Sequence, residues 1–460
     1  MDDLIDHLQH HTTNKCVIFH NQTNTRPLLA WLFTGQGSQY AGMGKELYRQ
    51  YHVFRDAVNT CCHHLQNEFP ESILDVIGYS NTPEHPDLIN NTIYTQTTLF
   101  ILEYALARLW ETWGGVPDIV MGHSIGEYVG ACIAGVFSLE EGLKLVSNRA
   151  KLMQSLPKNG AMAVVFASKP TVQKYIYDYQ YEKDISIAAV NGPENIVISG
   201  KDDSVNQMIE RLKTNNIVSL LLNVSHAFHS SLMTPMVSQF EQIANTIQFK
   251  APQLKIVSNI TGKIVTDEMS TASYWVDHII KPVQFYPSIE TIHKEQCHMF
   301  LEIGPKPILS GMGSRCLPDS KIKWMPSLTP DNPNLQLMKT LSGLYVNGVD
   351  IHWKNLFSKE YIPTINLPTY AFQRKKYWLK ELDDQNKKMK SRTDPIHPFL
   401  KINQRHPLMI FSLRLLLICF LHRNLIFLII QYWIILFFQQ VVLSRCLLLL
   451  PMKCLVKVLF

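Results

Sequence analysis

The sequence has few features of a secreted, zinc-binding or nucleic-acid-binding protein. Its nine cysteines are scattered over 460 residues without a C-x-x-C pair, which argues against a disulfide framework and a metal site and indicates a reducing compartment. The N-terminus carries acidic residues at once and no apolar segment, so no signal peptide is predicted and we expect a cytoplasmic protein. Residues 386–460 carry eleven Lys and Arg and one acid, which leaves residues 1–385 with a net charge of −5. This balance gives no electrostatic case for a nucleic-acid partner.

The C-terminal segment lacks what a folded domain needs. No acidic residue follows Asp394, and no glycine follows Gly348. Residues 424–444 hold no charge over 21 positions, which is long enough to cross a bilayer as a helix. Two interpretations stay open: a membrane anchor, or a sequence never selected for a fold, such as translation out of frame.

The strongest chemical signal is the pentapeptide Gly122–Gly126, which reads G-H-S-I-G. It follows a short apolar run and precedes a helix-compatible one, which is the sequence form of a nucleophile elbow. The glycines permit a tight turn that lifts the Ser124 hydroxyl out of the sheet. The backbone N–H of Ile125 would then point at a developing oxyanion. The alternative is a plain Gly/Ser turn between a strand and a helix.

Hydrophobic periodicity predicts an α/β protein whose pattern changes near residue 160. In the first part we expect strands at Leu29–Phe33 and Ile119–Met121 and helices at Thr98–Trp113 and Ser138–Leu156, the last with Ser138 and Glu141 in capping-box spacing. In the second part we expect strands at Ala161–Ala167, Ile185–Ala189, Ile196–Ser199 and Ile217–Val224, and helices at Pro170–Tyr177 and Asp203–Thr214. The second alternation is the order that a small ferredoxin-like insert would have.

Two further segments give the chain a family resemblance. Gly35-Gln36-Gly37 upstream of the G-H-S-I-G-E-Y run at 122–128 resembles the acyltransferase family, which includes malonyl-CoA:acyl-carrier-protein transacylases and the acyltransferase domains of modular polyketide synthases. The resemblance runs from about Arg26 to about Pro326. Residues 367–378, from Leu-Pro-Thr-Tyr-Ala-Phe-Gln-Arg to Tyr-Trp, resemble the segment that follows the acyltransferase in polyketide synthase modules.

The resemblance implies an α/β fold with an α/β-hydrolase-like large subdomain and an inserted ferredoxin-like small subdomain. The expected divisions are an N-terminal linker remnant (1–25), an acyltransferase domain (26–326) made of a large subdomain (26–157 and 224–326) and a small one (158–223), a post-acyltransferase linker (327–385) and a basic apolar tail (386–460). His406-Pro407-Leu408 resembles the start of a dehydratase domain, whose glycines and acids are then missing. We therefore favour an out-of-frame or truncated tail over a membrane anchor.

The resemblance also implies a serine–histidine dyad. A serine hydroxyl needs a base at neutral pH, and matching Val224–Met233 to the family puts that base at His229. His226 is the alternative base and otherwise the first position of the specificity motif. A backbone carbonyl, that of Gln284, would orient the His229 imidazole where a triad uses a carboxylate.

Further matches to the family concern the oxyanion and the substrate. The second oxyanion donor would be the N–H of Gln36, opposite that of Ile125. Arg149 lies at the edge of a core-facing stripe, where a charge is costly without a partner, and the matching family arginine binds the free carboxylate of malonyl-type extender units. Gln96 matches a family glutamine near the pocket. The phenyl ring of Phe228 fills space that an α-methyl group would need, so His226-Ala227-Phe228-His229 is the malonyl-selective form.

The expected reaction is acyl transfer by a ping-pong route. Ser124 would take a malonyl group from malonyl-CoA and pass it to the phosphopantetheine thiol of an acyl carrier protein. We expect no metal and no bound cofactor, other polyketide synthase domains such as a ketosynthase as partners, and a membrane only if residues 424–444 are an anchor. The alternatives are an α/β-hydrolase such as a thioesterase, which Arg149 and the Gln36 segment disfavour, and a non-functional fragment of a synthase module.

Overall fold

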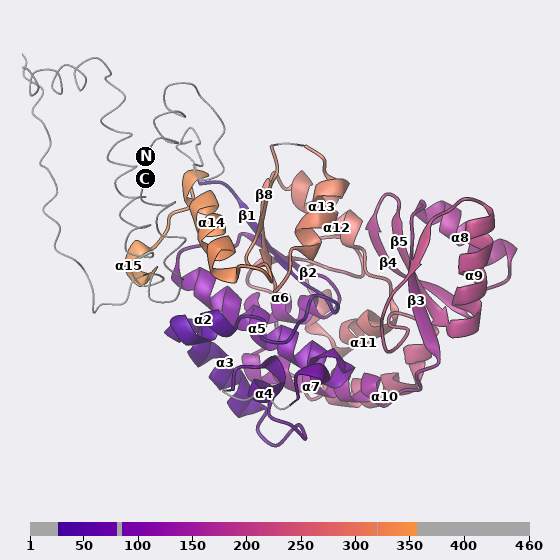
Figure 1. Ribbon diagram of the computed structural model, residues 1–460, viewed down its shortest axis with the longest axis horizontal. Helices are drawn as coiled ribbons and strands as arrows, with labels where there is room; N and C mark the ends of the chain where they lie inside the picture. Colours follow the sequence, from indigo (N-terminus) through magenta and orange to yellow (C-terminus); the bar gives the residue numbers. More distant parts are fainter. Residues whose placement is uncertain (1–25, 81–84, 320, 357–460) are drawn as a thin grey trace, which may run out of the picture. The chain divides into compact units, whose positions relative to one another are not determined.

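The computed structural model describes residues 26–80, 85–319 and 321–356 (Figure 1). The aromatic signature at 367–378 and the apolar tail lie outside the described residues, so the expectations for them stay predictions. Within the described ranges, no helix is both long and apolar enough to cross a membrane.

A parallel sheet of five strands forms the centre of the larger part of the fold, with the strand order β7-β2-β1-β8-β9. The strands are β1 (Leu29–Phe33), β2 (Ile119–Gly122), β7 (Lys255–Val257), β8 (Met299–Ile303) and β9 (Lys323–Pro326). All residues of β1 and β8 are buried. Because successive strand residues point to opposite faces, both faces of this sheet are covered, as in doubly wound α/β proteins.

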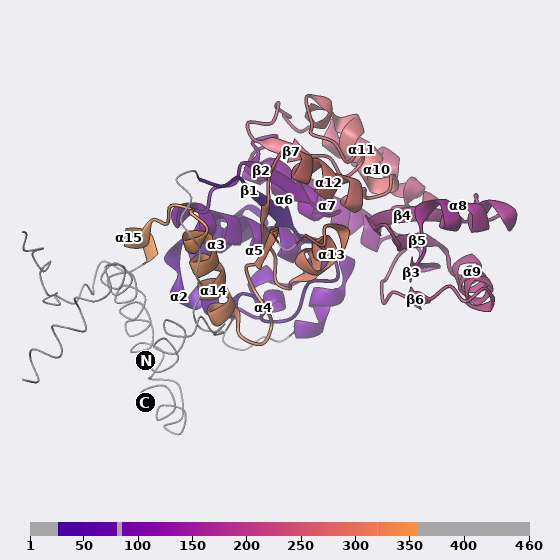
Figure 2. The same ribbon diagram turned by 90° about the horizontal axis from the view of Figure 1, so that it is seen from above.

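Helices supply that cover (Figures 1 and 2). They are α2 (Lys45–Gln50), α3 (His52–His64), α4 (Ile73–Ile77), α5 (Thr92–Thr112), α6 (Gly126–Ile133), α7 (Leu139–Gln154), α10 (Thr234–Ala244), α11 (Ala272–Ile280), α12 (Phe285–Lys294), α13 (Ile308–Cys316), α14 (Pro333–Val346) and α15 (Trp353–Leu356). We call this part of the described chain, outside 160–221, the large subdomain.

A second sheet, antiparallel and of four strands, forms the small subdomain at 160–221. Its order is β4-β5-β3-β6, with β3 (Gly160–Val165), β4 (Ile185–Gly192), β5 (Asn195–Lys201) and β6 (Ser219–Leu221). Helices α8 (Lys169–Asp178) and α9 (Asp202–Thr214) lie beside this sheet in both views (Figures 1 and 2) and share a separate apolar core with it. The βαββαβ order confirms the expected ferredoxin-like insert in an α/β protein.

Most predicted elements agree with the structure, but two differ clearly in length: the last strand of the insert, predicted at Ile217–Val224, is only Ser219–Leu221, and α5 is longer than predicted. The strand at Leu29–Phe33 has the predicted bounds, and α7 begins with the expected capping box: Glu141 N donates to Ser138 Oγ at 3.2 Å, and Ser138 N donates to Glu141 Oε2 at 3.1 Å. Helix α5 begins at Thr92, earlier than the predicted Thr98. Its first turns are rich in threonine, which favours strands and turns in isolation but is buried here by tertiary packing.

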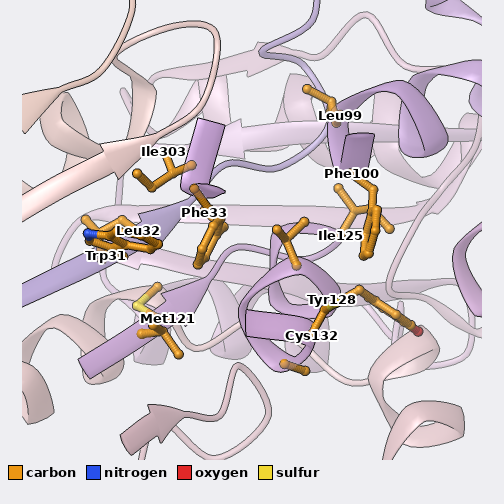
Figure 3. Close-up of a cluster of buried hydrophobic side chains, with 14 of the residues drawn as sticks. Trp31, Leu32, Phe33, Leu99, Phe100, Met121, Ile125, Tyr128, Cys132 and Ile303 are labelled. Atoms are coloured by element: carbon orange, nitrogen blue, oxygen red, sulfur yellow. The ribbon is translucent and has the colours of Figure 1, made fainter. Parts of the chain in front are cut away.

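The residues after β2 rest on a dense apolar core. Figure 3 shows Phe33 of β1, Met121 of β2 and Ile125 and Tyr128 of the following turn and helix within one cluster. The Ile125 side chain is 1 % exposed and packs into this cluster, so it holds the turn in place. The backbone of Ser124 and Ile125 lies on the side of the turn away from the cluster.

A short segment of the large subdomain, residues 281–284, pairs with the small sheet. Val283 N donates to Ala188 O at 2.9 Å, and Val190 N donates to Val283 O at 2.8 Å, so residues 281–284 add a bridge to the edge strand β4. Gln284 N then donates to Asn259 O at 2.6 Å in the large subdomain. This strap, residues 281–284, therefore ties the edge strand of the small sheet to the large subdomain.

Candidate active site

Ser124 occupies a strained turn between β2 and α6. Its φ is +52°, in the left-handed region that non-glycine residues seldom adopt. A Cβ on Gly122 would collide with the backbone of Gly126 and Glu127, and a Cβ on Gly126 would collide with the carbonyls of Phe33 and Thr34. Only glycine therefore fits at both ends of the turn, which has the geometry of a nucleophile elbow.

Asn259 fixes this elbow, and sequence reasoning did not single it out. Its Oδ1 accepts from Ser124 N at 2.8 Å, its Nδ2 donates to Gly122 O, and its own N–H donates to Glu127 Oε1 at 2.9 Å. An asparagine can do this because its side chain both donates and accepts. Asn259 lies 135 residues after Ser124 in sequence, so no local pattern would have identified the contact.

His229 contacts the Ser124 hydroxyl. Its Nε2 lies 2.8 Å from Ser124 Oγ, and its Nδ1 lies 3.0 Å from the backbone oxygen of Lys281. Because a carbonyl oxygen can only accept, the proton of the neutral ring lies on Nδ1 and Nε2 is free to accept the serine proton. Burial, followed by the nearby His278, Arg149 and His123, holds the pKa of His229 well below its usual value, so the ring is neutral at pH 7.

The carbonyl that orients His229 is not the one expected. The prediction of Gln284 is wrong: the Gln284 carbonyl accepts from Ser288 N at 3.0 Å and Ser288 Oγ at 2.7 Å, because Gln284 caps the start of α12. Lys281 ends α11 in an extended conformation and turns its oxygen toward His229 instead. The expectation that a backbone carbonyl takes the place of a carboxylate agrees with this contact.

His226 lies apart from the serine hydroxyl. Its Nδ1 is 2.9 Å from Ser225 Oγ, and its Nε2 is 3.1 Å from Leu156 O. Both ring nitrogens are engaged away from Ser124, so the alternative of His226 as the base has no geometric support. Phe228 is buried, and its ring centroid lies 6.1 Å from that of His226, so the two rings are neighbours.

Two backbone amides can serve an oxyanion. The N–H groups of Gln36 and Ile125 have no acceptor within the described part of the chain. The Gly35–Gln36 backbone approaches the elbow closely, because a Cβ on Gly35 would lie 2.9 Å from His123 O. Ile125 precedes α6, so its N–H also lies at the positive end of that helix.

Arg149 is a buried cation without an anion. It lies on α7 and is 2 % exposed, and no carboxylate within the described ranges lies within ion-pair distance of it. Its Nη1 donates to Gln96 Oε1 at 2.5 Å, its guanidinium carbon lies 5.4 Å from the Tyr128 ring centroid, and its Nε has no acceptor. Burial lowers the pKa of Arg149, but a guanidinium stays charged at neutral pH. The guanidinium is thus a buried positive charge with an unused donor, held at one end by the Gln96 side chain.

Two further buried side chains, Glu127 and His278, lie close together next to the elbow. Glu127 Oε2 lies 2.7 Å from His278 Nε2, and Glu127 Oε1 accepts from Tyr274 at 2.7 Å as well as from Asn259. Burial raises the pKa of Glu127 to about 8 and lowers the pKa of His278, so both shifts favour the uncharged forms of the two side chains. The His278 ring lies 6.0 Å from that of His229, which is close enough for it to contribute to the lowered pKa of His229.

Comparisons with known proteins identify the family. Residues 30–350 match the family described as "Acyl transferase domain". Polyketide synthase GfsB of Streptomyces halstedii is 37 % identical over 359 residues, a match that covers 76 % of this chain but 6 % of that protein. The acyltransferase domain from the second module of the salinomycin polyketide synthase is 37 % identical with a TM-score of 0.69, covering 75 % of this chain and 80 % of that structure. The malonyl CoA-acyl carrier protein transacylase of Clostridium perfringens is 27 % identical with a TM-score of 0.63, covering 69 % of this chain and 97 % of that structure.

The family match extends over most of the described chain and includes both subdomains. It also contains the strained serine, its histidine neighbour and the unpaired arginine. By this match the chain belongs to the acyl transferase domain family.

Proposed function

We propose that this chain transfers a malonyl group from malonyl-CoA to the phosphopantetheine thiol of an acyl carrier protein, as one domain of a cytoplasmic polyketide synthase. The observation that carries the proposal is Arg149, a buried guanidinium without a carboxylate partner in the described ranges, on the helix that packs beside the Ser124 elbow. Two parallel hydrogen bonds from a guanidinium suit a free carboxylate, which malonyl thioesters carry and simple acyl thioesters lack.

In the first half-reaction, His229 Nε2 takes the Ser124 proton while Oγ attacks the thioester carbonyl. The amides of Gln36 and Ile125 would stabilise the resulting oxyanion. The C–S bond then breaks, the proton returns from His229 to the thiolate, and CoA leaves as a thiol. A malonyl ester remains on Ser124.

In the second half-reaction, His229 takes the proton of the phosphopantetheine thiol, whose sulfur attacks the ester carbonyl. The C–O bond to Ser124 breaks and the proton returns to Oγ, which regenerates the free serine. The Lys281 carbonyl keeps the His229 proton on Nδ1 throughout. A neutral carbonyl stabilises imidazolium less than a carboxylate does, which suits thiolate leaving groups because they need little acid assistance.

The alternative hypothesis, that the chain is an α/β-hydrolase, has less support. A hydrolase triad places a carboxylate on His Nδ1, and that position is filled here by Lys281 O. No carboxylate within the described ranges lies within ion-pair distance of His229.

Intact-mass spectrometry of the full chain with malonyl-CoA tests the proposal. We expect one malonyl adduct, its loss in Ser124→Ala, and its transfer to a phosphopantetheinylated carrier protein. Ser155→Ala is the matched control, because Ser155 is exposed and its hydroxyl bonds only to Leu152 O. Release of free malonate without a carrier thiol would favour the hydrolase instead, and an adduct that persists in Ser124→Ala would exclude Ser124 as the nucleophile.

A further inference from the structure

A row of buried side chains lies behind the loop that carries Gln36. Glu103 of α5 contacts Thr34 Oγ1, Thr34 Oγ1 lies 3.0 Å from Ser38 Oγ, and Ser38 Oγ lies 2.9 Å from the carbonyl oxygen of Gly35. Thr34, Ser38 and Glu103 are all fully buried. The row thus runs from a carboxyl group inside the protein to the peptide bond that links Gly35 and Gln36.

The number of available hydroxyl protons determines which group donates in each contact of this row. The Gly35 oxygen can only accept, so Ser38 donates its one hydroxyl proton there. The contact between Thr34 and Ser38 then needs the Thr34 proton. No hydroxyl proton is left for the contact between Thr34 and Glu103, so the carboxyl group must supply it. Every contact in the row is satisfied when Glu103 is protonated and donates to Thr34.

The surroundings of Glu103 agree with a neutral carboxyl group. Its Oε2 has no hydrogen-bond partner, which is tolerable for the carbonyl oxygen of an acid but costly for half of a buried carboxylate. No basic side chain in the described ranges forms an ion pair with it. Burial, aided by Glu302 and opposed by the hydrogen bonds of Thr34, raises the pKa of Glu103 well above its usual value.

The end of the row determines where the Gln36 amide points. No peptide bond in the described chain is cis, so the Gly35 oxygen and the Gln36 hydrogen point in opposite directions. Ser38 holds the oxygen on the buried side, through its hydroxyl and through its N–H at 3.4 Å. A hydrogen bond to the carbonyl of a peptide also polarises its N–H, which then becomes a stronger donor. Without the Ser38 hydroxyl, only the longer bond from Ser38 N would hold this peptide, and the flanking Gly35 and Gly37 would let it rotate more easily.

We propose that protonated Glu103, acting through Thr34 and Ser38, positions and polarises the Gln36 N–H as an oxyanion donor. The three are positioning residues, because none of them touches the substrate. The proposal rests on the proposed acyl transfer, and it adds a hydrogen-bonded support to one of the two oxyanion donors of that reaction.

Single-turnover acylation by malonyl-CoA tests the row. Ser38→Ala and Thr34→Val each remove one hydroxyl, and we expect the acylation rate to fall about five- to tenfold, since each loss weakens one hydrogen bond. Binding of malonyl-CoA to a Ser124→Ala background should stay unchanged, as should the pH midpoint of the rate, because only the transition state uses the oxyanion donor. Thr34→Ser keeps a hydroxyl at this position, unlike Thr34→Val, and should retain most of the acylation rate of the unaltered protein.

Thr98→Val is the matched control. It removes a buried hydroxyl from the same helix as Glu103, but that hydroxyl bonds to Thr95 O and not to the row. We expect its acylation rate to equal that of the unaltered protein. A purely structural effect of deleting buried hydroxyls would slow this variant as well.

The protonation of Glu103 has its own readout. Infrared difference spectra at pH 7 should show a carbonyl band of a neutral carboxyl group that is absent from Glu103→Gln. Glu103→Gln keeps a donor toward Thr34 and should lose no more than about twofold in rate, whereas Glu103→Met should lose about as much as Thr34→Val.

Three results would overturn the proposal: folded Ser38→Ala with the full acylation rate, an equal loss of rate in Thr98→Val, or no Glu103 carboxyl band at pH 7. If Ser38→Ala fails to fold, Thr34→Val and the infrared band still decide. Failure of the proposed function is distinguishable, because it would appear in the unaltered protein as a missing adduct on Ser124.

Discussion

The two subdomains bury very different side chains. In the large subdomain the buried residues include Glu103, Glu127, Arg149, Glu302, His226, His229 and His278. Between Gly160 and Leu221 the buried polar residues are Asn191, Ser199 and Ser204, none of which carries a carboxylate, a guanidinium, an amine or an imidazole. The small sheet and its two helices close over an ordinary apolar core.

This difference separates the large subdomain, which holds the buried ionisable side chains, from the small subdomain, which supports their positions. A buried ionisable group costs free energy unless it is paired or neutralised, so a concentration of such groups marks a functional site. The small subdomain contributes position instead. It holds the 281–284 strap through backbone hydrogen bonds, and Asn191 Oδ1 lies 2.8 Å from Nε2 of His123, the residue before Ser124. Substitutions should therefore have large effects in the first part and modest ones in the second.

The proposed base should show the largest effect. Within the described part of the chain, His229 is the one side chain in hydrogen-bond contact with the Ser124 hydroxyl, so we expect His229→Ala to slow acylation by malonyl-CoA by about 10²–10⁴-fold. His226→Ala is the matched control, because it deletes an imidazole of the same segment whose nitrogens face Ser225 and Leu156. Stopped-flow or quenched-flow acylation measures both. A greater loss in His226→Ala would reverse the assignment of the base.

Arg149 should come next. Arg149→Ala removes the cation that we propose binds the substrate carboxylate, and we expect malonyl transfer to fall roughly 10- to 100-fold, as for one or two charge-assisted hydrogen bonds. Acetyl-CoA should be used relatively better, because the buried positive charge no longer disfavours a neutral acyl group. Arg211→Ala, on an exposed position of α9, controls for loss of an arginine. Unchanged malonyl-to-acetyl ratios in Arg149→Ala would show that the anion lies elsewhere.

Phe228 should change selectivity more than rate. Phe228→Ser opens space beside His226, and we expect the ratio of methylmalonyl to malonyl turnover to rise about tenfold, within the 1–3 kcal/mol that one methyl group is worth in an apolar pocket. Competition between the two thioesters measures this ratio. Phe166→Ser, at a position 40 % exposed in the small subdomain, is the control. The same ratio in both variants would exclude Phe228 from the acyl pocket.

Asn191 tests the supporting role of the small subdomain directly. Asn191→Ala breaks the contact to His123, and we expect acylation to slow about two- to tenfold, the value of one hydrogen bond. Asn206→Ala removes an exposed amide on α9 that bonds to Asp202 and should have no effect. A loss as large as that of His229→Ala would contradict the division between chemistry and support.

The pH dependence should be the smallest effect near neutrality. The pKa of His229 is lowered from its usual 6.5, so the base form already predominates at pH 6.5. The acylation rate should therefore change less than about twofold between pH 6.5 and 8, and it should fall only below that range, as the ring becomes protonated. A midpoint above pH 7 would show that the His229 site favours the charged ring.

The sequence predicted the fold well because its elements obey local rules. Strand β1 is a continuous apolar run, α7 has its capping box, and the insert changes the period of the pattern. The start of α5 was missed because threonine has a weak helix propensity that tertiary burial overrides.

Residues of the site could be predicted where the expected role belongs to a side chain that a family motif identifies. Ser124, His229 and Arg149 lie where the family resemblance implies, although their roles stay proposals. Gln284 failed because the role belongs to a backbone oxygen, and any residue of the strap could have supplied it. Asn259 and Glu103 were missed because their meaning depends on contacts across 135 and 69 residues, which no spacing in the sequence reveals.

The pairing of β3 with β6 has a consequence for how such proteins can be recombined. The first and last strands of the insert are neighbours, with Ala163 opposite Leu221, and Leu222 N donates to Met162 O at 2.8 Å just beyond the pair. Both crossover points therefore meet at a single place on the host scaffold. A chimera that exchanges the whole insert with that of a relative has to preserve this junction, the bridge to the 281–284 strap, the Asn191 contact and the apolar packing of Met162, Ala188, Ala189 and Val197 in the core of the large subdomain.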